Sequence, residues 1–248
     1  ITPDRFLPLC AECGLTGELD LVIAEKVFAA LPLIARSIPV NEIVVSINIS
    51  ACLLEDADMR SRLLALIDAA YLPLNWKLQV ELVEDAFRDE SDEFDQFLAQ
   101  LAQRNIYIAI DDFGAGYSSF ARLASLPIQV VKIDKKFAGL LDDSESGGTY
   151  GRVLATMLTL IKDLGMTAVA EGVETESQRA WLQARGVARG QGFLFAKPLG
   201  IAELMAGLQQ SGYLSSALPS EPLRRSSGRR RRPWTRLQLP FLDRRNHK

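Results

Sequence analysis

Residues 106–119 read IYIAIDDFGAGYSS: branched and aromatic side chains lead into two adjacent acids, Asp111 and Asp112, and then into a glycine-containing loop. The alternation predicts a buried strand over residues 106–111. Acids at the end of such a strand are typical of a site at the carboxyl edge of a parallel sheet. The fold therefore depends on what the rest of the chain places around this edge.

Similar short apolar runs recur along the chain and alternate with helical patterns. The predicted strands cover residues 43–49, 78–83, 106–111, 130–133, 167–171 and 187–191. After an amphipathic region at 19–35, helices are predicted near residues 58–70, 92–103, 119–124, 151–164, 176–184 and 202–209. Repeated strand–helix units favour parallel strands joined by right-handed crossovers, in either a barrel or an open doubly wound sheet.

The two faces of each strand favour the barrel. In VVSINIS (residues 44–50) valine and isoleucine occupy one face, and serine and asparagine the other. An open sheet covered by helices on both sides would be apolar on both faces. Polar residues at the carboxyl ends of many strands fit the top of a TIM-type barrel, where active sites form. Six side chains are expected to converge there: Asn48, Glu81, Asp111, Lys132, Glu171 and Gln191.

We therefore predict an α/β fold, a TIM-like (β/α)8 barrel. Such a barrel needs about eight strands, and the sequence provides six. The first one or two are expected to precede Ile1, in a longer protein, since the chain does not begin with Met.

Composition narrows the possible chemistry. No apolar run reaches the roughly 18 to 20 residues of a membrane span, and the given N-terminus lacks the basic-then-apolar order of a signal peptide, so a cytoplasmic location is predicted. Cys10 and Cys13 form a lone CxxC and are expected to be reduced thiols. With His247 as the single histidine, a Ser-His-Asp triad, a Cys-His pair and a histidine-rich zinc site are excluded.

Charge divides the chain into two parts. From Pro219 onward the net charge is +8, which leaves −11 for residues 1–218 out of a total of −3. Residues 213–248, rich in Arg, Pro and Ser, are predicted to be a disordered basic tail behind a folded domain at 1–212. Nucleic-acid binding by the tail is disfavoured, because the acidic body repels phosphates and no basic–aromatic interleaving appears beyond Trp234.

The converging acids need positive charge between them. Glu81, Asp111, Asp112 and Glu171 would repel one another, and one lysine, Lys132, cannot balance them. Oxygen donors without Cys or His favour Mg²⁺ or Mn²⁺. Adjacent acids at a strand end allow one carboxylate to bridge two ions while its neighbour binds the second. Two such ions about 4 Å apart are suited to phosphodiester hydrolysis.

The motifs SINIS, ELVE, DDFGAGYSS, VKID, AEGVE and QGFLFAKP, in this order, resemble the EAL-domain family of bacterial cyclic di-GMP phosphodiesterases. The resemblance covers roughly residues 2–210. It implies a barrel that hydrolyses cyclic di-GMP to linear pGpG with two Mg²⁺ or Mn²⁺ ions, and that Ca²⁺ inhibits. It also implies a homodimer and an upstream sensory or regulatory domain, in a larger protein, either membrane-attached or not, that acts in second-messenger signalling and biofilm control.

The resemblance also implies roles for individual residues. The metal ligands would be Asn48 and Glu81 for the first ion, Asp111 as the bridge, and Asp112 and Glu171 for the second ion.

The catalytic group would include Lys132, which positions the attacking water or the phosphate, with Gln191, Glu171, Glu84 and Glu174. Glu84 would anchor the loop at 113–119, and Glu174 would hold the metal ligands in place without binding an ion itself. The residues that contact substrate would be Asp112, Lys132, Gln191, Phe113 and Gly114.

Departures from the family pattern leave alternatives open. The chain begins after the family's Glu-Ala-Leu motif, so the first metal lacks one ligand, and Val83 replaces the usual Thr of ELTE. One alternative is a receptor that binds cyclic di-GMP without cleaving it. If the missing strands were absent from the natural protein, an unstable or domain-swapped fold would be expected, because the sheet would keep an unpaired edge.

Overall fold

The computed structural model describes residues 2–37, 43–114, 120–139, 141, 148–210 and 238–240. The strands are β1 (Ile43–Ile49), β2 (Trp76–Val83), β3 (Tyr107–Phe113), β4 (Val130–Ile133), β5 (Thr167–Ala170), β6 (Arg189–Gly190) and β7 (Gln238–Pro240). The helices are α1 (Pro3–Glu12), α2 (Thr16–Ser37), α3 (Ala51–Glu55), α4 (Ala57–Ala69), the 3-10 helix η1 (Glu84–Arg88), α5 (Asp92–Gln103), α6 (Phe120–Ser125), α7 (Lys135–Gly139), α8 (Gly148–Asp163), α9 (Glu176–Ala184) and α10 (Ile201–Gln210).

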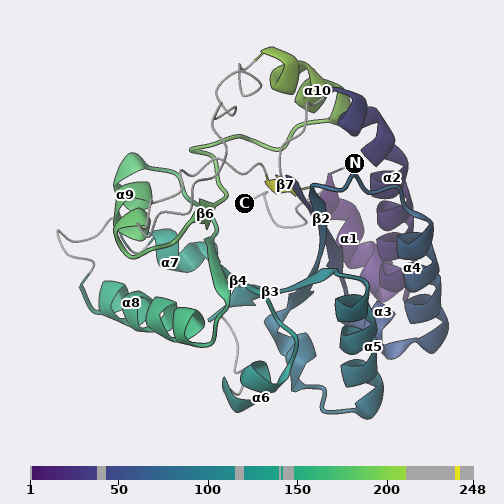
Figure 1. Cartoon of the computed structure of the whole chain (residues 1–248), viewed down its shortest axis with the longest axis horizontal. Coiled ribbons are helices and arrows are strands. Elements are labelled where there is room, and N and C mark those ends of the chain that lie inside the picture. Colours follow the sequence, from purple (N-terminus) through teal and green to yellow (C-terminus); the bar gives the residue numbers. More distant parts are fainter. Residues whose placement is uncertain are drawn as a thin grey trace, which may run out of the picture.

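The strands form one parallel sheet in the order β6-β5-β4-β3-β2-β1-β7. From β1 to β6 each strand lies beside its predecessor in sequence, as in a barrel, whereas a doubly wound sheet reverses its order. The sheet curls, and the helices lie on its outer side, with α2, α4 and α5 at one end and α8 and α9 at the other (Figure 1). The predicted TIM-like α/β fold is confirmed.

A seventh strand, β7, was not predicted. It pairs with the edge of β1 at Val44, Val45 and Ser46. It falls within residues 213–248, the segment predicted as a basic tail. The other residues of that segment lie outside the described part of the chain. The disorder of the tail stays a prediction.

The outer face of the sheet carries the main apolar core. Ile47, Val80 and Ile108 project from neighbouring strands and are buried against the helices. Helix α5 shows how the sequence builds this layer. The Ser91 hydroxyl caps its first turn by accepting from the Phe94 N–H, and its apolar residues share one face that packs on the sheet.

The inner face is smaller and mixed. Ala109, Val130 and Val169 form a short apolar layer there. Above this layer, toward the carboxyl ends of the strands, the buried side chains are polar or charged. In the part of the chain that the structure describes, no helix is both long and apolar enough to span a membrane.

Candidate active site

The two adjacent acids lie at a backbone irregularity in β3. Pairing between β3 and β4 shifts register between Ile110 and Phe113. Asp112 adopts a left-handed conformation (φ 56°), and its N–H donates to Asp111 Oδ1 at 3.1 Å. Regular alternation would send the two carboxylates to opposite faces. Here, one oxygen each of Asp111, Asp112 and Glu171 lie within 4.8 Å of one another, so the irregularity lets both acids serve one site.

Lys132, on the inner face of β4, lies among the carboxylates of Glu81, Asp111 and Glu171. Together with Asp112, these acids are called the acid cluster below. The Nζ of Lys132 is 2.6 Å from Glu81 Oε2, 2.6 Å from Glu171 Oε1 and 3.1 Å from Asp111 Oδ1. All four side chains are buried. Burial lowers the pKa of Lys132, but the three carboxylates together raise it well above its ordinary value. The ammonium group is therefore protonated at neutral pH and acts as a buried counter-ion.

Glu171 shows that this one cation is not enough. Burial, opposed by Lys132 and assisted by the charges of Asp111 and Glu81, raises the pKa of Glu171 to about 7. Gln191 Nε2 donates to Glu171 Oε1 at 2.9 Å and holds the carboxylate toward the cluster. Three buried carboxylates meet a single ammonium group here, and such an excess of acidic groups favours the binding of divalent cations.

The predicted ligands of the first ion are neighbours across β1 and β2. The parallel register places Asn48 opposite Glu81, on the inner face. Glu81 is bonded through both oxygens, since Oε2 meets Lys132 and Oε1 accepts from Gln79 Nε2 at 2.9 Å. The amide oxygen of Asn48 and the carboxylate of Glu81 are both oxygen donors of the kind that Mg²⁺ and Mn²⁺ bind.

Glu84 and Gly114 form a contact beside the cluster. Glu84 is buried, and its Oε2 accepts from the Gly114 N–H at 2.9 Å, as expected for an anchor of the loop that follows β3. Gly114 has φ +95°, and an added Cβ would lie 2.7 Å from Phe137 and 2.9 Å from Met157. Glycine is therefore required for this approach. The remainder of the predicted loop, residues 115–119, lies outside the described part of the chain.

Two predicted site residues are not brought to the carboxylates. Phe113 is buried in the apolar core, and Glu174 is exposed just before the Thr175 cap of α9. Their proposed roles stay predictions. Conversely, Gln79 and Ser46 contact the site region, although sequence reasoning gave them no role. The sequence pattern that could have identified them is the strand alternation, since Gln79 shares a polar face with Glu81, and Ser46 shares one with Asn48.

The acid cluster meets the requirements of a divalent metal site. Its donors are oxygen atoms from buried or half-buried side chains at the ends of β1, β2, β3 and β5. One oxygen each of Asp111, Asp112 and Glu171 lie close enough together to share an ion, and burial, with the charges of Asp111 and Glu81 added, raises the pKa of Glu171. Mg²⁺ or Mn²⁺ fits this donor set, because neither ion needs nitrogen or sulfur ligands.

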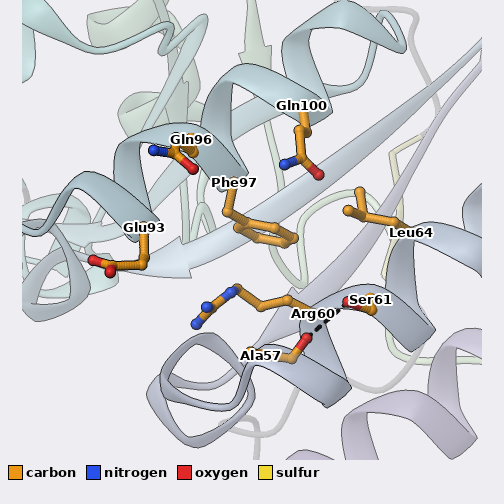
Figure 2. Close-up of a pocket in the computed structure, with 8 residues that line it drawn as sticks. All are labelled: Ala57, Arg60, Ser61, Leu64, Glu93, Gln96, Phe97 and Gln100. Carbon is orange, nitrogen blue, oxygen red and sulfur yellow. Dashed lines mark hydrogen bonds between the residues drawn. The ribbon is translucent and has the colours of Figure 1, made fainter.

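A hollow lies away from these carboxylates, between α4 and α5 (Figure 2). Phe97 lies at its centre, and Leu64, Arg60, Glu93 and two glutamines surround it. Ser61 Oγ, which also lines it, donates to the carbonyl oxygen of Ala57 at 2.9 Å. None of its lining residues belongs to the acid cluster, so we assign the chemistry to the carboxyl end of the sheet.

Comparison with known proteins supports this assignment. The family model described as EAL domain matches residues 1–198. Probable cyclic di-GMP phosphodiesterase PdeB of Escherichia coli is 33% identical over 199 residues, which are 80% of this chain and 36% of that protein. Cyclic di-GMP phosphodiesterase NbdA of Pseudomonas aeruginosa is 31% identical over 225 residues, 90% of this chain and 27% of that protein. The chain spans about a third of the length of these relatives or less.

Solved structures also superpose on the chain. The phosphodiesterase PaMucR, in a complex with cyclic di-GMP, superposes with a TM-score of 0.73 at 29% identity, covering 82% of this chain and 81% of that one. The EAL domain of Mycobacterium smegmatis DcpA superposes with a TM-score of 0.68 at 29% identity, covering 78% and 85%.

Proposed function

Because the chain belongs to the EAL domain family, we propose that it hydrolyses one phosphodiester bond of cyclic di-GMP to give linear pGpG. The observation that carries the proposal is the buried group of Glu81, Asp111, Lys132 and Glu171, with Asp112 beside it. The relatives named as cyclic di-GMP phosphodiesterases agree with this chemistry.

The metal ions would be held by oxygen donors from four strands. We assign Asn48 and Glu81 to one ion, Asp111 to a bridging position, and Asp112 and Glu171 to the other. Bound Mg²⁺ or Mn²⁺ supplies an activated water and stabilises the charge that develops on the phosphate. Ca²⁺, which prefers longer bonds and more ligands, is expected to bind and inhibit.

Lys132 acts as a donor. Its Nζ lies within 3.1 Å of Glu81, Glu171 and Asp111, where an ammonium group would orient the attacking water or a phosphate oxygen electrostatically. Gln191 keeps Glu171 in place through its amide hydrogen bond. Glu84, through Gly114, fixes the start of the loop that follows the two acids, and we place Gly114 near the substrate on that basis. Phe113, which is buried in the apolar core, would support this loop from below and would not contact the substrate through its ring.

The proposal also covers an upstream domain, the cellular location and the oligomeric state. The relatives are about three times as long as the aligned region or longer, so we propose that an upstream sensory or regulatory domain controls the barrel. We also propose a cytoplasmic homodimer.

The test is direct. The full-length protein is incubated with cyclic di-GMP and Mn²⁺, Mg²⁺ or Ca²⁺, and pGpG is measured by chromatography, with Glu171→Gln as the matched inactive variant. We expect product with Mn²⁺ or Mg²⁺, and none with Ca²⁺ or from the variant. Saturable nucleotide binding in Ca²⁺, without cleavage in Mn²⁺ or Mg²⁺, would contradict hydrolysis and identify a receptor.

A further inference from the structure

Gln79 lies on the inner face of β2, two residues before Glu81, and is fully buried (0% exposed). Its Nε2 donates to Glu81 Oε1 at 2.9 Å and to Ser46 Oγ at 3.1 Å. Its own carbonyl oxygen is buried with no hydrogen-bond partner among the described residues. The amide therefore uses both of its N–H groups and none of its acceptor capacity.

The orientation of this amide is determined by Glu81. An ionised carboxylate only accepts hydrogen bonds. If the amide of Gln79 were turned over, its oxygen would face the Glu81 oxygen at 2.9 Å, and two acceptors would repel each other. Gln79 thus meets Glu81 only as a donor, and Ser46 on the neighbouring strand takes the second N–H.

This arrangement does not favour stability. A buried acceptor without a partner is unfavourable, and an apolar side chain of similar size would avoid that cost. Suitable apolar neighbours exist, because Ala109 and Tyr107 lie on the same face of the adjacent strand. A polar residue that costs stability next to a functional group indicates a role in function.

The effect of Gln79 falls on the Glu81 carboxylate. One oxygen of Glu81 is held by Gln79 and the other by Lys132, so the carboxylate cannot rotate freely. A neutral amide achieves this without adding charge to a site that already carries several carboxylates. A held carboxylate loses less conformational freedom when it binds an ion.

We propose that Gln79, itself held by Ser46, is a positioning residue that orients Glu81 for metal binding. The inference rests on the proposed metal-dependent function, and goes beyond it by assigning a determinant of metal affinity to a residue that touches neither ion nor substrate.

The test measures Mn²⁺ binding by calorimetry, together with thermal unfolding without metal, in the wild-type chain and in Gln79→Met. Removal of such a supporting hydrogen bond typically weakens metal affinity about 10- to 100-fold. We expect a weakening of this size, an unfolding temperature that is unchanged or higher, and a matching rise in the Mn²⁺ concentration that gives half-maximal activity.

Gln129→Met is the matched control. The Oε1 of Gln129 accepts from the Ile108 N–H and its Nε2 donates to the Pro127 carbonyl, both at 2.8 Å, so these hydrogen bonds join it to the backbone and not to a carboxylate. We expect this variant to unfold at a lower temperature with unchanged Mn²⁺ affinity. Ser46→Ala, which removes only the second anchor, should weaken Mn²⁺ binding in the same direction but less.

The outcomes separate the two proposals. A wild-type chain that binds no Mn²⁺ overturns the proposed function, and this inference with it. A wild-type chain and a Gln79→Met variant that bind Mn²⁺ equally overturn the inference alone. If Gln79→Met does not fold, Ser46→Ala decides, and unchanged Mn²⁺ affinity in that variant overturns the positioning role.

Discussion

The two faces of the curled sheet both contain fully buried side chains, but of opposite chemistry. Ile108 on the outer face of β3 is 0% exposed, and so is Asp111 on the inner face of the same strand. The outer face contacts helices through apolar side chains, whereas the inner face gathers carboxylates around one lysine. Burial alone therefore does not distinguish the two faces: the apolar outer face stabilises the fold, whereas repulsion among the carboxylates of the inner face opposes it.

The largest effect is expected on the inner face. Asp111→Asn keeps the shape of the side chain but removes the charge that would bridge the two ions, so we expect phosphodiesterase activity to fall by at least about 10³-fold, or about 4 kcal/mol in barrier height. The free energy of unfolding without metal should be unchanged or larger, because repulsion is relieved. Activity assays and urea titrations in EDTA measure both. A clear loss of stability would show that Asp111 supports the fold instead.

Lys132→Met tests the counter-ion. Removing one partner of a buried ion pair typically costs about 3–5 kcal/mol, and here three carboxylates lose their partner. We expect a loss of this order in EDTA, and a smaller loss in saturating Mn²⁺, because bound ions replace the missing charge. Urea unfolding with and without Mn²⁺ checks this prediction. An equal loss in both conditions would mean that the ions do not bind among these carboxylates.

Ile108→Ala tests the outer face in the same strand. Truncation of a fully buried isoleucine leaves a cavity and should cost about 2–5 kcal/mol in the free energy of unfolding. Mn²⁺ affinity of the folded fraction should stay at the wild-type value, since no ligand is touched. Urea titration and calorimetry provide the two readings. Weakened Mn²⁺ binding by fully folded protein would show that the two faces are coupled.

The sequence could predict this division because strand side chains alternate. The polar and apolar faces of residues 43–49 and 130–133 predicted β1 and β4 with correct bounds, and the convergence of Glu81, Lys132 and Glu171 followed from the parallel order. The irregularity at Asp112 could not be predicted, because it is a backbone feature with no side-chain period.

Other features escaped prediction for different reasons. Strand β7 is only three residues long and lies in a segment whose charge suggests no strand. The link between Gln79 and Glu81 was visible as two residues on one face. Its meaning depends on the direction of a single hydrogen bond and on an unpaired oxygen, which only coordinates reveal.

The smallest effect is expected at the rim, where the two faces end. Val83, the last residue of β2, pairs in register with Asp111 but is 41% exposed, and it stands where the family pattern has Thr. Val83→Thr should change the free energy of unfolding by less than about 0.5 kcal/mol, because the side chains have nearly the same shape and water solvates the hydroxyl. Urea titration and activity assays decide the matter. A large gain in activity at unchanged stability would mean that the rim beside Asp111, and not the buried carboxylates alone, limits the reaction.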